Sequence, residues 1–350
     1  MTDTIEWYRS PTMQPPEQPS ASRSLRNWIR DRLPEPDVRG KTLVLYSRRT
    51  FPKATRTGIR SEFHGLFSEF HSVLGALVYA ETHGAAGVRV HFESPLYDEP
   101  ARGPNWWTYF FESAAMRVQP GAFETAPEVH LNAILTKYGR FGGFSDIVGG
   151  PLAHLYPMTY GLDRSTLHRL LTTYVRVRPE ILDEVQRFIA ARFEPGAYIV
   201  GVHYRGTDST HKWTGALNHY RMSRVPYEAY VDEVRRVLDA AAPRAYQIFV
   251  ATDEIDCLEF MHRQFGDRVL ALDDAPRVRP HQQAVHLDRS LSVSKYQKGR
   301  SALVDCLLLA GVSYLVKGRS NLSDASLAFN PQLPYSFCPD VAAVLNSSGR

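Results

Sequence analysis

The chain has 350 residues, of which 43% are hydrophobic and 22% charged, and its formal net charge is +4. This length and composition are typical of a globular protein with about two domains. The basic residues are spread along the chain without runs of like charge, so the sequence gives no support for nucleic-acid binding.

The cysteine content and the hydropathy pattern indicate the cellular compartment of the protein. The three cysteines are too few and too scattered for a disulfide framework or a zinc site, which fits a reducing compartment. No apolar stretch has the form of a signal peptide or the length needed to span a bilayer. We therefore expect a cytoplasmic protein with no transmembrane segment.

The first half of the chain opens with a segment rich in Pro, Ser and charge over 1–40, which we expect to be a flexible N-terminal arm. Buried strands are predicted over 41–49 and 87–93, with a helix between them that ends at Gly84. A second helical stretch over 164–193 is expected to break near Pro179.

The second half alternates regularly between apolar runs and helical patterns. Strands are predicted over 197–204, 246–251, 268–272 and 313–318, and helices over 227–242, 255–265, 299–311 and 321–328. This alternation is typical of a parallel sheet covered by helices on both faces. We expect an α/β protein with an N-terminal domain over 41–195 and a C-terminal domain over 196–350.

Polar residues cluster where two of these strands end, and ligands of parallel sheets bind beyond that edge. In "HYRGTD", His203 and Arg205 point to the same side of the strand, and a guanidinium there needs an anion. That anion is either a phosphate or a local carboxylate such as Asp208. In "VATDE", Thr252 and Asp253 are candidate site residues, although Asp253 could also be the N-cap of the next helix.

The segment "KGRSNLSDAS" ends a strand and opens a helix whose free N–H groups favour an anion. Ser320, Asn321 and Ser323 add side-chain donors there, with simple helix capping as the alternative. In the first half, the backbone around Gly65, Phe67 and Ser68 in "HGLFSEFH" could cradle a phosphate at a helix start.

Asp305 lies among apolar residues of a predicted helix, where an unpaired carboxylate is costly. It could accept hydrogen bonds from Arg300, or from two N–H groups of a base such as guanine, or have a purely structural role. The chain contains no G-x-G-x-x-G, no P-loop and no D-x-D triplet, and its histidines lack the spacing of metal ligands.

As an ordered set, "HYRGTD", "VATDE" and "GRSALVD…GRSNLS" resemble the three motifs of the fucosyltransferase superfamily. This superfamily includes the rhizobial nodulation, core α1,6- and protein O-fucosyltransferases. The stretch "FHGLFSEFHSVLGALVYA" is similar to the N-terminal domain of its bacterial members. The resemblance implies a GT-B fold, in which two Rossmann-like domains face a cleft, and metal-independent, inverting transfer of fucose from GDP-fucose to a glycan or glycoconjugate hydroxyl.

Residue by residue, the resemblance implies that Arg205 binds the β-phosphate of GDP, that His203 contacts the nucleotide and that Asp305 reads guanine. Ser320 and Asn321 match phosphate-binding positions, and the segment at Gly65 matches the phosphate loop of the N-terminal domain. We expect Thr252, Asp253, Arg300 and Ser323 to complete the donor-binding set, and Arg205 and Asp208 to be catalytic. No cofactor or metal is implied.

Two departures from the family pattern leave alternatives open. Gly206 stands where the family has a second arginine, and no residues match the catalytic Lys and Glu of core fucosyltransferases. The candidates for the catalytic base are Asp208, Glu69 and His211, and Asp208 could instead orient Arg205 or cap the loop. The chain could also use another nucleotide sugar on the same fold, or bind GDP or a phosphoglycan without catalysis.

Overall fold

The computed structural model describes residues 37–46, 65–121, 123–132, 164–206, 225–280, 282, 285, 288, 290–318 and 320–338. The arm predicted over 1–40 lies almost entirely outside these residues. All three cysteines are buried and free of disulfide bonds, as expected. None of the helices in the described ranges is long and apolar enough to cross a membrane.

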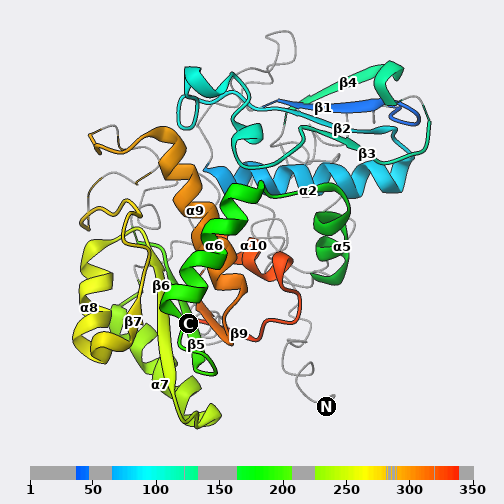
Figure 1. Cartoon of the computed structure of the whole chain (residues 1–350). Helices are drawn as coiled ribbons and strands as arrows, with labels where there is room; N and C mark the ends of the chain where they lie inside the picture. Colours follow the sequence, from blue (N-terminus) through cyan, green and yellow to red (C-terminus); the bar gives the residue numbers. More distant parts are fainter. Residues whose placement is uncertain are drawn as a thin grey trace, which may run out of the picture.

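The first half of the chain forms a four-stranded sheet in the order β3-β2-β1-β4. Its strands are β1 (Thr42–Tyr46), β2 (Gly87–His91), β3 (Ala115–Arg117) and β4 (Glu128–Asn132). β1 pairs in parallel with both β2 and β4, and β3 is an antiparallel edge strand. The long helix α2 (Leu66–His83) lies along one face of this sheet (Figure 1).

The second half forms a five-stranded sheet in the order β7-β6-β5-β8-β9, and all of its neighbouring strands are parallel. The strands are β5 (Tyr198–Tyr204), β6 (Tyr246–Thr252), β7 (Val269–Leu270), β8 (Tyr314–Lys317) and β9 (Tyr335–Phe337). β5 is buried along almost its whole length, as a central parallel strand covered on both faces should be.

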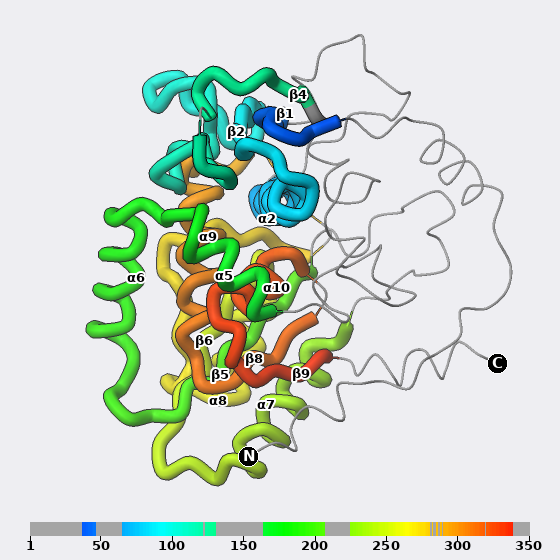
Figure 2. Tube along the Cα trace, turned by 90° about the vertical axis from the view of Figure 1, so that its right-hand side faces the viewer, coloured from blue at the N-terminus to red at the C-terminus, as the bar shows by residue number. Residues whose placement is uncertain are grey.

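Helices cover both faces of the second sheet. α7 (Tyr227–Ala241) and α8 (Ile255–Phe265) pack on one face and α9 (Lys295–Ala310) on the other, while α6 (Pro179–Arg192) packs on α9, and α5 (Arg164–Tyr174) packs on α10 (Asn321–Phe329) and on α2. The 3-10 turns Pro100–Arg102, Trp106–Tyr109 and Phe123–Thr125 belong to the first half, and Gly266–Arg268 belongs to the second. α7 and α8 close one apolar core, and α5, α6, α9 and α10 belong to a second core that continues into the first sheet. In Figure 2, α2 is seen nearly end-on between β1 and the pair α5 and α10.

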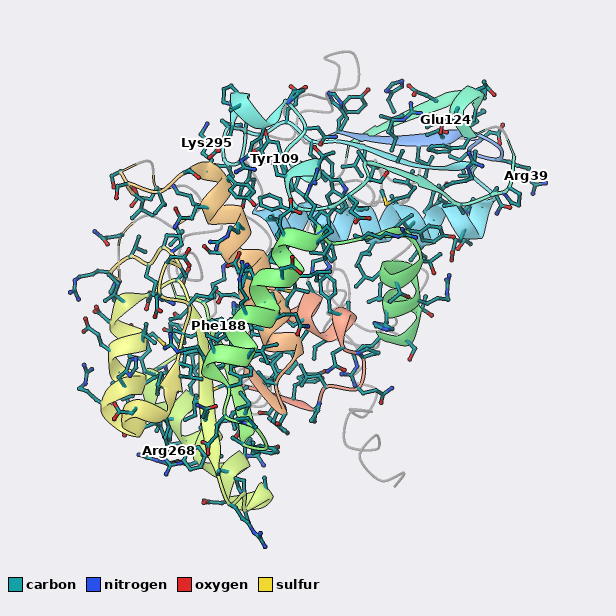
Figure 3. The ribbon with its side chains drawn as sticks, viewed as in Figure 1. Arg39, Tyr109, Glu124, Phe188, Arg268 and Lys295 are labelled. Carbon is teal, nitrogen blue, oxygen red and sulfur yellow. The ribbon has the colours of Figure 1, made fainter. Side chains whose placement is uncertain are left out.

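Helix α9 joins the two halves at its first turn. The ring of Tyr296 stacks on that of Phe110 at 5.5 Å, and its backbone N–H donates to the Glu99 carboxylate at 2.8 Å. Gly299 is required at this contact because a Cβ there would clash with the Phe110 ring. Figure 3 shows Lys295, at the same end of α9, next to Tyr109 of the first half.

The predicted elements of both halves are confirmed within a few residues, including the Gly84 C-cap in the left-handed region and the helix break before Pro179. Helix α9 begins at Lys295, four residues earlier than expected, because Ser294 caps it by accepting from the Gln297 N–H. Strands β3, β4 and β9 were not predicted. The division into domains at residue 195 stays a prediction.

Candidate functional site

A cavity lies where the chain order of the second sheet reverses. The chain moves outward from β5 through β6 to β7 and then returns to place β8 on the other side of β5. A parallel sheet with such a reversal leaves a crevice beyond the carboxyl ends of the two strands on either side of it. Here those strands are β5 and β8, and each is followed by polar residues singled out in the sequence.

The cavity has a volume of about 150 Å³. A cavity of that size holds a benzene ring in another protein, so a base or sugar ring has room here. Its described walls come from both halves of the chain: Gly65, Leu66, Phe67, Ser68, Tyr97, His203, Tyr204, Arg205, Ala251, Thr252, Asp253, Ala275, Pro276, Val285, Lys298, Ser301, Ala302, Asp305, Asn321 and Leu322. Nine of the residues predicted from sequence are therefore brought together.

His203 and Arg205 reach the cavity from the end of β5. Burial, the Arg205 charge and the Lys317 charge together lower the pKa of His203 to about 3, so its imidazole is neutral at physiological pH. Its Nδ1 is buried and has no hydrogen-bond partner among the described residues. His203 can therefore hydrogen-bond a ligand as a neutral imidazole, and a pKa lowered in this way does not suit a proton carrier near pH 7.

Asp305 is 7% exposed and reaches the cavity from the middle of α9. Burial raises its pKa from 3.8 to about 7, with a smaller opposing effect from the Arg277 charge. Its Oδ1 is buried without a hydrogen-bond partner in the described part of the chain. A carboxyl group in this state is ready to accept N–H donors from a ligand, because such donors offset the cost of its ionised form.

Asp253, which follows β6, forms a hydrogen bond to the backbone that follows β5, beside the cavity. Its Oδ1 accepts from the Gly206 N–H at 3.0 Å, and the N-cap of α8 is the next residue, Glu254. The alternative in which Asp253 is the N-cap of this helix is therefore wrong. Thr252 supports the same turn, because its hydroxyl accepts from the Glu254 N–H at 3.2 Å.

The N-terminus of α2 brings Gly65, Phe67 and Ser68 to the cavity from the first half. Part of the expected amide cradle is already engaged. The Leu66 N–H donates to the Tyr97 hydroxyl at 2.8 Å, and the Ser68 N–H donates to the Gly65 carbonyl at 2.8 Å. An anion here would meet a first turn with fewer free donors than the sequence suggested.

The N-terminus of α10 brings Asn321 to the cavity, but not the two serines predicted with it. Ser320 is the N-cap and accepts from the Leu322 N–H at 3.2 Å, and the Ser323 hydroxyl donates to the Ser320 carbonyl at 3.2 Å. Both serines are buried. Ser320 therefore caps the helix, which is the alternative that the sequence left open, and the Ser323 hydroxyl bonds back within the first turn.

Arg300 points away from the described cavity walls. Its guanidinium bonds to the carboxylates of Glu184 and Asp274, each at 2.7 Å. It therefore provides no hydrogen bond to Asp305, and that alternative for Asp305 is wrong. Asp208 and His211 lie outside the described residues.

Sequence reasoning missed four polar residues of the cavity wall: Tyr97, Tyr204, Lys298 and Ser301. Lys298 and Ser301 lie seven and four residues before Asp305, so helical spacing from Asp305 would have placed them on the same face of α9. The Lys298 ammonium donates to the Asp288 carbonyl, and burial lowers its pKa. No comparable sequence pattern marks Tyr97. Burial raises the pKa of its hydroxyl to about 12.

The described ranges contain no group of three or more His, Cys, Asp or Glu side chains placed to hold a metal ion. The polar side chains of the described cavity wall are two cations, two carboxyl groups, a neutral imidazole, five hydroxyls and one amide. This set suits a ligand that is anionic at one end and carries N–H donors at the other.

No protein-family model and no curated protein matches this sequence. Among solved structures, the chain is similar to NodZ alpha-1,6-fucosyltransferase soaked with GDP-fucose (17% identity, 83% of this chain and 93% of that chain, TM-score 0.48). It is also similar to fucosyltransferase NodZ from Bradyrhizobium (17% identity, 82% and 92%, TM-score 0.43) and to POFUT1 in complex with GDP (11% identity, 86% and 99%, TM-score 0.44). These structural neighbours are fucosyltransferases.

Proposed function

We propose that the chain is a glycosyltransferase that binds a GDP-sugar in this cavity, most simply GDP-fucose, and transfers the sugar to a hydroxyl of a glycan or glycoconjugate. We further propose a GT-B arrangement, with the donor bound by the second half and the acceptor by the first. The supporting observations are the geometry of the cavity and the order of the three sequence motifs.

The observation that carries the proposal is the set of buried polar atoms on the cavity wall that lack partners in the described ranges. They are Nδ1 of His203, Oγ of Ser301 and Oδ1 of Asp305. Buried polar groups without partners are rare in folded proteins and mark sites where a ligand or water completes the bonding. Asp305 offers acceptors that match the N1–H and N2–H groups of guanine.

Arg205 is the residue proposed to meet the leaving group. Transfer breaks the bond between the anomeric carbon and the phosphate oxygen, and the negative charge that develops stays on GDP. A fixed guanidinium at the end of β5 can stabilise that charge without reorganisation. The N-terminus of α10 adds a favourable dipole beside it. In this proposal no metal ion takes part.

The acceptor hydroxyl attacks the anomeric carbon from the face opposite GDP and inverts its configuration. Its proton must pass to a base, for which Asp208, Glu69 and His211 remain the candidates. Glu69 is buried in the first turn of α2, on the side of the first half. Its position on a helix that lines the cavity supports keeping it in this group.

A second candidate function is suggested by Gly206, which stands where the resemblance leads us to expect an arginine. With one arginine fewer, the cavity could serve to bind GDP or a phosphoglycan without turnover. A further alternative is that the same fold binds a different nucleotide sugar. The two acceptor oxygens of Asp305 disfavour any nucleotide whose base lacks two adjacent N–H donors.

The experiment that separates these candidates is a turnover assay with GDP-fucose, in which released GDP and transferred fucose are both measured. The proposal expects turnover by the natural chain that is lost in Arg205→Ala. GDP binding without release of fucose to water or an acceptor would favour the non-catalytic candidate. Turnover that survives Arg205→Ala would remove this residue from the mechanism.

A further inference from the structure

Two polar residues on one face of α9 line the cavity, and each has a buried side-chain oxygen without a partner in the described ranges. They are Ser301, which is 3% exposed, and Asp305. They lie four residues apart, so their Cβ atoms are neighbours about 6 Å apart on the helix surface. A hydroxyl and a carboxylate thus stand side by side on one wall.

The Ser301 hydroxyl does not form the hydrogen bond that helical serines usually find. Such serines commonly donate to the carbonyl four residues earlier. In this protein Ser72 does so to Ser68 at 3.1 Å, and Ser326 does so to Leu322 at 3.3 Å. Ser301 has neither that bond nor another one to the described residues. No described group therefore competes with a ligand for a hydrogen bond from this hydroxyl.

The order of donor and acceptors along this wall can be compared with the edges of the bases. A hydroxyl followed by a carboxylate presents one donor and then two acceptors. Guanine presents the complementary row, the O6 acceptor followed by the N1–H and N2–H donors. Adenine presents a donor amino group at position 6 and an acceptor at N1, so its N1 would face the carboxylate unfavourably.

We propose that Ser301 is a specificity-determining residue whose hydroxyl donates to O6 of a bound guanine while Asp305 accepts from N1–H and N2–H. This inference rests on the proposed function, because it requires a guanine nucleotide in the cavity. It gives a role to a residue that lies within the motif "GRSALVD" but to which the resemblance assigns none, and it explains why the Ser301 hydroxyl is buried without a partner among the described residues.

The test is calorimetric binding of GDP and of inosine diphosphate, which keeps O6 and N1–H but lacks the 2-amino group. Loss of one neutral hydrogen bond should weaken binding about three- to tenfold. Ser301→Ala should therefore lower the affinity for GDP and for inosine diphosphate by the same factor within this range. Ser326→Ala is the matched control, since Ser326 is buried against α9 and bonds to the Cys306 carbonyl at 2.9 Å. It should leave both affinities unchanged.

Three results would overturn the inference while leaving the proposed function standing. The first is that Ser301→Ala binds GDP as tightly as the natural chain. The second is that Ser301→Ala weakens GDP but not inosine diphosphate, which would place the hydroxyl at the 2-amino end of the base. The third is an equal loss in Ser326→Ala, which would show a general effect of serine removal. Failure of the natural chain to bind either nucleotide would instead overturn the proposed function, and this inference with it.

Discussion

The carboxyl group of Glu254 occupies the space that a side chain at position 206 would need. A Cβ added to Gly206 would clash with the Glu254 carboxyl carbon and with both of its oxygens. Glu254 is fully buried, and its Oε2 accepts from the Tyr227 hydroxyl at 2.7 Å. Gly206 and Glu254 thus belong together. The buried Glu254 carboxyl group leaves no room for an arginine, or for any other side chain, at position 206.

This relationship predicts that Gly206→Ala destabilises the fold. Its φ lies outside the left-handed region, so alanine would suffer from the clash and not from backbone strain. Overpacking of this kind typically costs about 1–3 kcal/mol in the free energy of unfolding. Chemical denaturation of Gly206→Ala should show such a loss. The same substitution made in Glu254→Ala should cost much less, and an equal cost in both backgrounds would contradict the account.

The raised pKa of Asp305 leads us to predict that the affinity for a guanine nucleotide depends on pH. Its pKa of about 7 in the empty cavity means that the acid form predominates below that pH. Guanine N–H donors bind the ionised form, so binding should release a proton and the affinity should rise as pH increases from about 6 to 8. The slope can reach at most about tenfold per pH unit below the pKa.

Calorimetry in buffers of different ionisation enthalpy would measure this proton release. The phosphates of GDP also titrate near this range, and Asp305→Asn, which has no carboxyl group at this position, separates the two effects. The proton release attributed to Asp305 should disappear in this variant. A pH profile that is identical in both proteins would show that Asp305 does not ionise on binding.

Asp305 also predicts a stability gain when it is neutralised. Because its folded pKa is raised above the unfolded value of 3.8, burial favours the acid, and the folded protein loses stability as pH rises from about 4 to 7. Above pH 7 this loss is complete. Asp305→Asn should therefore unfold at a higher temperature than the natural chain at pH 8, with a smaller difference at pH 5. A lower melting temperature at pH 8 would contradict this expectation.

Arg300 and Arg205 should respond differently to removal, although the sequence placed both at the donor site. Arg205 lines the cavity, whereas Arg300 bonds to Glu184 on α6 and to Asp274. Loss of a charge contact to the leaving group typically lowers the rate by about 10²–10³. We expect Arg205→Ala to lower turnover by that order and Arg300→Ala to lower the melting temperature while GDP affinity is kept. The reverse pattern in binding and thermal-melting measurements would contradict the placement of both side chains.

The sequence predicted those elements and site residues that a pattern in the neighbouring residues marks. β5, β6 and α8 were found because apolar runs and helical spacing mark them within a few residues, and His203 and Asp305 were found because polar groups stood out against such runs. The three-residue strands β3 and β9 were missed because they are too short for a period to show. Tyr97 was missed because its role depends on a contact with Leu66, 31 residues away. Arg300 was misplaced for the same reason, since Glu184 lies 116 residues away from it in the chain.

The central claim is that this cavity holds the donor nucleotide of a metal-independent glycosyl transfer. Its most direct test is calorimetric titration of the natural chain with GDP, UDP and ADP, each in the presence and absence of EDTA. We predict that GDP binds, that UDP and ADP bind at least tenfold more weakly, and that EDTA changes none of the affinities. No binding of GDP, or binding that is lost with EDTA, would contradict the claim.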